Sequence, residues 1–176
     1  MGRGGALTAD LDNTPLGVAD GAFRAETHDV KTADGQPAVQ YLSQSAKRNI
    51  SVVFGSGRVL ETTVSPQSEA TPLSLSSAVP AGVLPLTEGF RQIAEATTCP
   101  AGFTMYDGRR VVQIATAAKT SDGASDICTM DYRVTAGPGH LSPFRFKSLG
   151  MTLTYTGGRL AEMNFTAGGF ELRFTR

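Results

Sequence analysis

The sequence predicts a mainly β protein, built from antiparallel strands with one covering α-helix. Twenty glycines among 176 residues, together with frequent Thr, Val and Phe, are typical of short strands joined by tight turns. Apolar and polar residues alternate through many short runs, whereas convincing helical spacing occurs in one stretch, residues 87–98. We therefore expect one antiparallel β domain over residues 21–176, with its helix near 87–98.

The charge balance limits the classes of partner. The chain has 16 Lys and Arg residues and 16 Asp and Glu residues, and no run of basic residues is present. Nucleic acids and anionic membrane surfaces attract a concentrated positive field, so neither is expected as the main partner. No apolar stretch is long enough for a transmembrane helix, and no metal-ligand spacing or cofactor motif stands out.

Residues 1–20 are expected to form a flexible N-terminal tail. They are small and polar and are interrupted by Pro15 and Gly17. They contain no apolar segment of a secretory signal, so we expect an exported protein to have lost its signal peptide. The Met1-Gly2 start resembles a myristoylation motif, but Ala6 stands where that motif has Ser or Thr.

Residues 23–64 are predicted to form an antiparallel meander of four strands, with turns at residues 33–35 and 55–57. The Gly55-Ser56-Gly57 segment could be compared with a nucleophile elbow or a phosphate loop. It lacks the flanking residues of both motifs, so a hairpin turn is the favoured interpretation. The four strands are expected at residues 23–30, 38–43, 49–54 and 58–64.

A Pro/Ser/Thr-rich loop, residues 65–80, precedes the helix and is expected to be a lid or a covering excursion. Within the helix, four residues from Phe90 to Thr97 form one apolar stripe. Such a helix needs a sheet to pack on, and it leads directly into Cys99.

A hairpin is predicted at residues 103–114, because two alternating runs flank Asp107-Gly108, a favoured two-residue turn. Alternate residues from Phe103 to Ile114 then form an apolar core face. The expected cross-strand pairs are Tyr106 with Arg109, Met105 with Arg110 and Phe103 with Val112.

Arg109 and Arg110 end the segment Tyr106-Asp107-Gly108-Arg109-Arg110. We interpret them as a solvated hairpin tip, in which Arg110 covers Met105 and Arg109 lies against the Tyr106 ring. The alternative is a contact with an anion or a protein partner.

Cys99 and Cys128 flank this hairpin and are expected to form a disulfide bond. A bridge that closes a loop of about thirty residues would stabilise the fold by roughly 3–4 kcal/mol in the chain-entropy model. The alternative is a pair of buried free thiols in a cytosolic protein.

The last three strand candidates predict a continuous apolar wall. A two-residue turn at Gly168-Gly169 aligns the apolar residues of the last hairpin. In the preceding hairpin, alignment requires an odd-length loop or a bulge at Gly157-Gly158. The expected pairs are Met151 with Phe165, Leu153 with Met163, Tyr155 with Ala161, Phe165 with Leu172 and Met163 with Phe174.

The wall has two interpretations, ordinary core or the lining of an apolar ligand cavity. In the second, the ligand-binding residues would be Met151, Leu153, Met163, Phe165, Leu172 and Phe174. Catalysis finds little support, because His28 and His140 are the two histidines and neither belongs to a recognisable catalytic constellation. Either could be a surface residue, and no catalytic residue is assigned.

Several short segments occur in a characteristic order. They are Pro85-Leu86-Thr87, Cys99 followed by Tyr106-Asp107-Gly108-Arg109-Arg110, Cys128 with Tyr132, Ala136-Gly137, and Gly169-Phe-Glu-Leu-Arg-Phe174. In these features the sequence, from about Tyr41 to its end, resembles the proteobacterial envelope proteins grouped as domain of unknown function 3108.

That resemblance implies an exported, periplasmic protein with an incompletely closed antiparallel β-barrel, similar to the lipoprotein carriers of the LolA and LolB type. The concave face of such a half-barrel can hold acyl chains. We therefore expect a non-enzymatic protein that binds a lipid or another apolar ligand in the cell envelope. One alternative is a structural or accessory protein that binds another envelope protein through a sheet edge or Arg109 and Arg110, and another is a hydrolytic enzyme.

Overall fold

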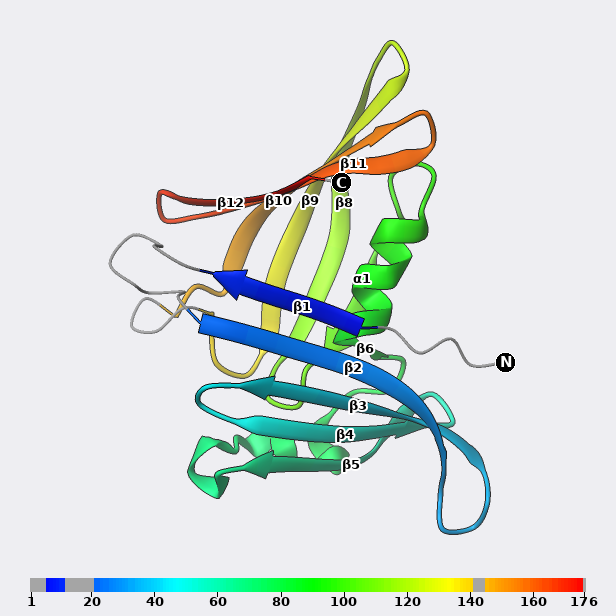
Figure 1. Ribbon diagram of the computed structural model, residues 1–176, viewed down its shortest axis with the longest axis vertical. Helices are drawn as coiled ribbons and strands as arrows, with labels where there is room; N and C mark the ends of the chain where they lie inside the picture. Colours follow the sequence, from blue (N-terminus) through cyan, green and yellow to red (C-terminus); the bar gives the residue numbers. More distant parts are fainter. Residues whose placement is uncertain (1–5, 12–20, 141–144, 176) are drawn as a thin grey trace.

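The computed structural model describes residues 6–11, 21–140 and 145–175, which form two β-sheets and one α-helix (Figure 1). The expected mainly β fold is confirmed. The first sheet is antiparallel, and its strands follow the order of the chain. It consists of β1 (Ala6–Leu11), β2 (Gly21–Lys31), β3 (Pro37–Ser45), β4 (Asn49–Gly55) and β5 (Arg58–Ser65).

The four strands expected between residues 23 and 64 are therefore confirmed, but the tail assigned to residues 1–20 is wrong in part. Ala6 to Leu11 form a strand that pairs with β2. Leu7 packs against the core of the first sheet, and this apolar contact favours a paired strand over a solvated tail. Residues 1–5 and 12–20 lie outside the described part of the chain.

The second sheet has seven strands and curls into an open half-barrel, which confirms the expected incompletely closed barrel (Figure 1). It is not wholly antiparallel, because the short strand β6 runs parallel to β7. The hydrogen-bonded order is β12, β11, β10, β9, β8, β7 and β6. The strands are β6 (Leu84–Pro85), β7 (Phe103–Tyr106), β8 (Val111–Asp122), β9 (Ser125–Ala136), β10 (Ser148–Thr156), β11 (Arg159–Ala167) and β12 (Phe170–Thr175).

The helix α1 (Leu86–Glu95) packs against β7 and β11 of this sheet and buries Ile93. It ends three residues before the expected position, because Ala96 is extended. Gly89 has no room for a side chain, since a Cβ atom added there would lie 2.1 Å from Sδ of Met105. The Tyr155 hydroxyl donates to the Ile93 carbonyl at 2.8 Å, which joins the helix to β10.

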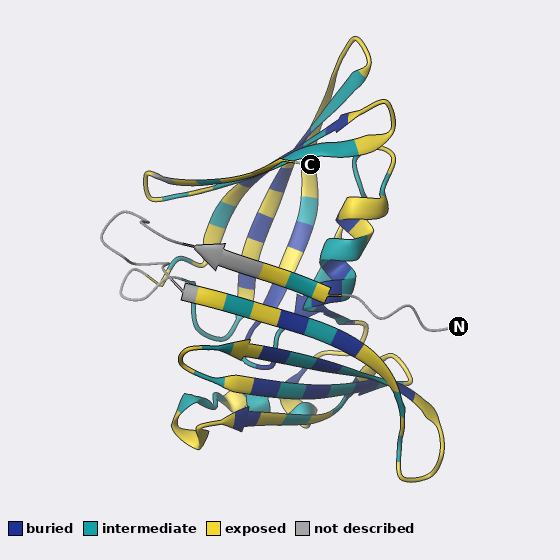
Figure 2. Cartoon of the chain, viewed as in Figure 1, coloured by how far each residue is buried: buried dark blue, intermediate teal, exposed yellow. Residues whose placement is uncertain are grey.

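Two hydrophobic cores result, and buried and exposed residues alternate along the strands that form them (Figure 2). One core lies between the second sheet and α1. The other lies between the first sheet and residues 65–83, which include the 3-10 turns η2 (Gln67–Glu69), η3 (Pro72–Ser74) and η4 (Ser76–Ala78). Leu73 and Val79 are buried there, so this loop is a covering excursion.

The registers of the last two hairpins confirm most of the predicted pairs. Phe165 lies opposite Leu172, Met163 opposite Phe174, Met151 opposite Phe165 and Leu153 opposite Met163. The predicted bulge is present, but the turn keeps two residues and Ala161 is the additional residue inside β11. Tyr155 therefore faces Leu160, and the predicted pair with Ala161 is wrong. Register slips of one residue would turn Met163 and Phe165 away from the core, so the bulge preserves the apolar face.

Candidate functional site

The β7–β8 turn differs from the predicted hairpin by two residues in register. Tyr106 pairs with Val111 and Phe103 with Ile114, so the turn is centred on Gly108 and Arg109. The Asp107 carboxylate accepts hydrogen bonds from the amides of Arg109 and Arg110, each at 2.9 Å. These two bonds favour Asp107 as the residue before the turn. A shift of two residues preserves the predicted faces.

The interpretation of Arg109 and Arg110 as a solvated tip is wrong. Arg110 is 8% exposed, and the side chain of Arg109 is 14% exposed. Arg109 Nε donates to the backbone carbonyl of Glu69 at 2.6 Å, and its Nη2 lies 3.3 Å from the Glu69 carboxylate. Arg110 Nε lies 2.9 Å from the Asp107 carboxylate. Arg109 therefore pairs with the loop of residues 65–83, which covers the turn, and Arg110 pairs within the turn itself.

The position predicted for Tyr106, beside Arg109 on a solvated tip, is also wrong. Tyr106 is fully buried in the core of the first sheet. Its hydroxyl donates to the Leu73 carbonyl at 2.6 Å and lies 3.2 Å from the Thr62 hydroxyl. Burial raises the pKa of Tyr106 to about 12, so it remains a neutral donor. Its ring packs edge-on against Phe54 of β4, with ring centroids 6.4 Å apart.

His140 takes part in a buried polar network with the same turn. Arg110 Nη1 donates to His140 Nδ1 at 2.7 Å, and His140 Nε2 lies 2.9 Å from the Tyr132 hydroxyl. Burial and the neighbouring Arg110 charge lower the pKa of His140 to about 4, so the imidazole is neutral near pH 7. The surface role considered for His140 is therefore wrong, whereas His28 is exposed and lies 3.3 Å from Glu26.

The segment from Tyr106 to Arg110 thus forms a junction between the two sheets. Thr71 and Ser74 donate their hydroxyl hydrogens to the carbonyls of Arg109 and Gly108, at 3.1 and 3.2 Å. Its side chains are committed to internal contacts. These contacts explain the sequence of this segment by a structural role, which is to hold the two sheets together. No chemical reaction is assigned to it.

The expected disulfide is confirmed, because Cys99 and Cys128 are bonded with their Cα atoms 5.5 Å apart. Cys128 is buried in the core of the second sheet, and Cys99 follows α1. The bond therefore links the segment after the helix to β9. Close by, the Asp126 carboxylate accepts hydrogen bonds from Lys119, Thr98 and Ser121, which lower its pKa to about 2.

The predicted apolar wall divides into two parts. Met151 and Leu153 are fully buried in the core that α1 covers, together with Ile93. Met163, Phe165 and Leu172 are half-buried, and Phe174 is 39% exposed. None of the six residues lines the cleft described below. Their role in ligand binding stays a prediction.

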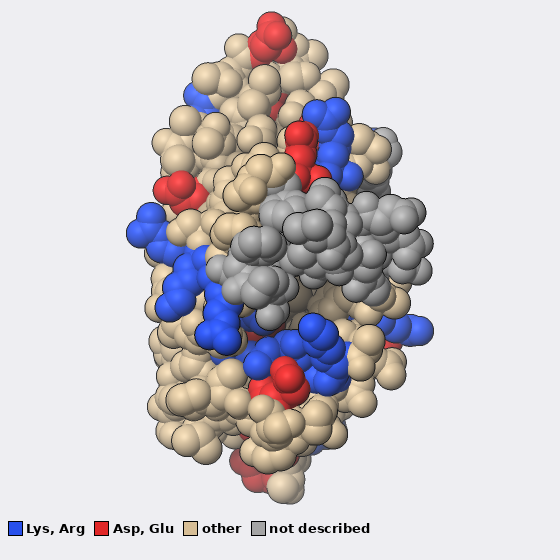
Figure 3. Space-filling view, turned by 90° about the vertical axis from the view of Figure 1, so that its left-hand side faces the viewer, with Lys and Arg blue, Asp and Glu red and all other residues tan. Residues whose placement is uncertain are grey.

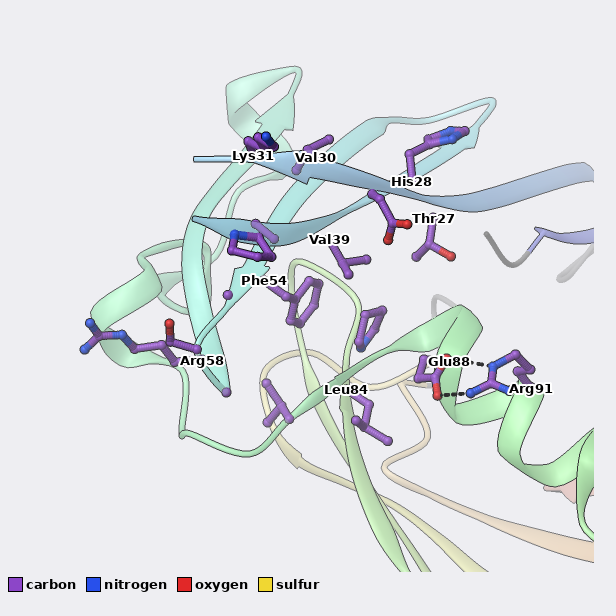
Figure 4. Close-up of a pocket in the computed structure, with 18 residues that line it drawn as sticks. Thr27, His28, Val30, Lys31, Val39, Phe54, Arg58, Leu84, Glu88 and Arg91 are labelled. Carbon is purple, nitrogen blue, oxygen red and sulfur yellow. Dashed lines mark hydrogen bonds and ion pairs between the residues drawn. The ribbon is translucent and has the colours of Figure 1, made fainter. Parts of the chain in front are cut away.

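A large cleft lies elsewhere, between the ends of β2 and β3, the β4–β5 turn and the start of α1 (Figure 4). Its volume is about 1040 Å³, within reach of a lipid-sized or drug-sized ligand. In Figure 4, Val39 and Phe54 lie opposite Leu84 across this space. The apolar residues that line it are Val30, Pro37, Ala38, Val39, Phe54, Val83, Leu84 and Pro85.

Polar side chains border the cleft. Arg91 Nε donates to Glu88 at 2.8 Å, and this bond lowers the pKa of the Glu88 carboxyl. Arg91 also contacts Glu95, so its charge is neutralised locally. Lys31 and Arg58 are exposed at the rim. The sequence indicated these strands, but the approach of the β4–β5 turn to the start of α1 is a long-range contact that no local pattern encodes.

Among residues 6–11, 21–140 and 145–175, no group of His, Cys, Asp and Glu side chains could hold a metal ion. In the same part of the chain, no helix has the length and apolar character required to cross a membrane.

These features define a class of protein, an open β half-barrel with a helix over its concave sheet and an apolar cleft beside that helix. Comparisons with protein-family models, with curated proteins and with solved structures found no match to this chain.

Proposed function

We propose that this protein is a non-enzymatic binding protein for a lipid or another apolar ligand. The observation that carries the proposal is the cleft of about 1040 Å³ beside α1. The buried Phe54 and Val83 and the half-buried Val39, which pairs with Phe54, form an apolar floor, and the exposed Lys31 and Arg58 lie at its border. Binding sites for apolar small molecules combine such a floor with a few polar groups that orient the ligand.

The proposal moves the site away from the predicted C-terminal wall. Met151 and Leu153 already pack against the helix, so an acyl chain there would have to displace Ile93. Displacement of packed side chains costs free energy, whereas an existing cleft needs no such change. The cleft beside α1 is therefore the better candidate.

Fluorescence titration with the neutral probe N-phenyl-1-naphthylamine tests this proposal. Wild-type protein should enhance the probe's fluorescence, and Val39→Glu should weaken binding at least about tenfold, because a carboxylate on the floor must be desolvated by the probe. Leu75→Glu introduces the same charge at an exposed residue outside the cleft and should leave the affinity unchanged. No binding by the wild type, or equal binding by Val39→Glu, would contradict the proposal.

We also infer that the protein works in an oxidising compartment such as the periplasm. The Cys99–Cys128 bond supports this, because disulfides persist outside the reducing cytosol. Alkylation of thiols in intact cells, followed by mass spectrometry, should find both cysteines protected. Two alkylated cysteines would refute this inference.

The alternative function, binding of another envelope protein, has support from a different feature. β12 has β11 as its one neighbour among the described strands, so its other edge is unpaired, and Phe174 on it is 39% exposed. Such an edge can accept a strand from another chain. A photo-activated cross-linker at position 174 should then capture one discrete partner, and the Val39→Glu change should not affect that capture.

A further inference from the structure

Basic side chains gather on one face of the molecule, where Figure 3 shows a band of Lys and Arg across its middle. The residues come from three segments that are far apart in the sequence: the β3–β4 turn, the β7–β8 turn and the connection from β9 to β10. The basic face consists of the exposed or partly exposed cations Lys47, Arg48, Arg145 and Lys147. Arg109 and Arg110 are buried and paired with Glu69 and Asp107, and they join the segments that carry this face.

Contacts join these three segments. Arg48 Nε and Arg109 Nη2 lie 3.2 and 3.3 Å from the same carboxylate oxygen of Glu69. Arg110 contacts His140, whose backbone exchanges hydrogen bonds of 2.8 and 2.9 Å with Phe146. Phe146 stands between Arg145 and Lys147, so the basic residues of the third segment are adjacent to the turn.

The three segments together carry an excess of positive charge. Two carboxylates, Glu69 and Asp107, pair with three of their six cations, which are Arg48, Arg109 and Arg110. The difference between six cations and two carboxylates leaves an excess of four positive charges, although the whole chain has a formal net charge of +0. Folding therefore produces a local positive field that the net charge of the whole chain does not indicate.

An exposed apolar side chain follows the same junction. Leu75 is 66% exposed and comes directly after Ser74, whose hydroxyl donates to the Gly108 carbonyl at 3.2 Å. These cations and Leu75 lie outside the cleft beside α1. Exposed cations together with an exposed leucine near the same junction match the interface of a bilayer with anionic headgroups.

We propose that the basic face docks this protein on an anionic lipid bilayer. The β3–β4 turn is at the opposite end of the first sheet from the β2–β3 and β4–β5 turns, which border the apolar cleft. The cleft therefore stays open to solvent in the docked protein. Docking is independent of the proposed ligand binding, and either can fail without the other.

Sedimentation with phospholipid vesicles tests the proposal. The full chain should bind vesicles of equal parts phosphatidylglycerol and phosphatidylcholine but not vesicles of phosphatidylcholine alone. Binding should disappear in 1 M salt, where the screening length falls to about 3 Å. Lys47→Gln with Lys147→Gln removes two exposed cations and should weaken binding about tenfold, and Leu75→Ser should weaken it severalfold.

The matched control is Arg159→Gln with Arg173→Gln, which changes the net charge equally at β11 and β12 and should alter binding less than about twofold. An equal loss in this control would show that net charge alone governs binding and would overturn the proposal. Binding to phosphatidylcholine alone would also overturn it. Binding of poly-glutamate without binding of vesicles would assign the basic face to an acidic protein instead.

Discussion

Arg109 contacts Glu69 through two separate groups. Its Nε donates to the Glu69 backbone carbonyl at 2.6 Å, and its Nη2 lies 3.3 Å from the Glu69 carboxylate. Because Glu69 ends η2, this contact joins the loop that covers the first core to the β7–β8 turn of the second sheet. The position of that loop therefore depends on a side chain that the sequence pattern suggested to be solvated.

The two contacts can be separated by mutation. Arg109→Ala removes both the hydrogen bond to the carbonyl and the ion pair, so it should lower the free energy of unfolding by about 2 kcal/mol. Glu69→Ala retains the backbone carbonyl and should cost less than about 1 kcal/mol, since the carboxylate is partly exposed. Urea denaturation measures both values, and equal costs would show that the ion pair dominates.

Gly108 is predicted to be intolerant of any side chain. Its φ is +95°, and an added Cβ would lie 2.3 Å from Cγ2 of Ile50. Gly108→Ala should therefore destabilise the protein by about 2–4 kcal/mol, through backbone strain and overpacking. Gly57→Ala is the matched control, because Gly57 has φ +73° but no atom within 4 Å of the added Cβ. It should cost about 1 kcal/mol, and similar melting temperatures for the two variants would contradict this account.

Tyr106→Phe removes a buried donor and leaves the Leu73 carbonyl without it. We expect a loss of about 1–2 kcal/mol in the free energy of unfolding. The control is Tyr41→Phe. The Tyr41 hydroxyl is buried without an ordinary hydrogen bond among the described residues, although Ser43 lies close enough to influence its pKa. Its removal should be neutral or stabilising, and the opposite order of stabilities in guanidinium denaturation would refute the assigned contacts.

His140 should make stability depend on pH. Its pKa is lowered from 6.5 to about 4 in the folded protein, so between these values the unfolded chain binds more protons. The free energy of unfolding should therefore fall as the pH is lowered from 6.5 towards 4. His140→Gln should reduce the difference between pH 7 and pH 4.5 by on the order of 1–2 kcal/mol. Leu75→Ser is the control, because it changes an exposed residue that has no titratable group, and it should leave that difference unchanged; an identical effect of both changes would rule out His140 as the cause.

The disulfide should contribute substantially to stability. Cys99→Ser with Cys128→Ala should lower the free energy of unfolding by about 2–4 kcal/mol, because the unfolded chain gains conformational freedom. The reducing agent dithiothreitol should lower the melting temperature of the wild type but not of this double variant. A wild type insensitive to reduction would indicate that the bond adds little.

Local patterns account for a large part of the fold. Alternation and turn residues correctly indicated the strands from β2 to β5, the last two hairpins and the bulge in β11, because side-chain direction in a strand has a strict period of two. Cys99 and Cys128 also formed the expected bond. The helix was placed correctly except at its end, where the extended Ala96 terminates it.

The candidate site could not be predicted from local sequence patterns. Val39, Phe54 and Leu84 belong to separate strands, and their approach depends on how two sheets and a helix pack. The clustering of Lys47, Arg48 and Lys147 on one face likewise arises from contacts between distant segments, which neither composition nor periodicity records.

The sequence by itself determined which residues form strands, which faces are apolar and which cysteines pair, since these depend on local periodicity and on a small set of partners. The tertiary structure alone decided that Tyr106 and Arg110 are buried, because Tyr106 is covered by a loop more than thirty residues away and Arg110 packs with His140, thirty residues further along the chain. Burial is a property of the packed layers, and it converts an apparent surface turn into the junction of two sheets.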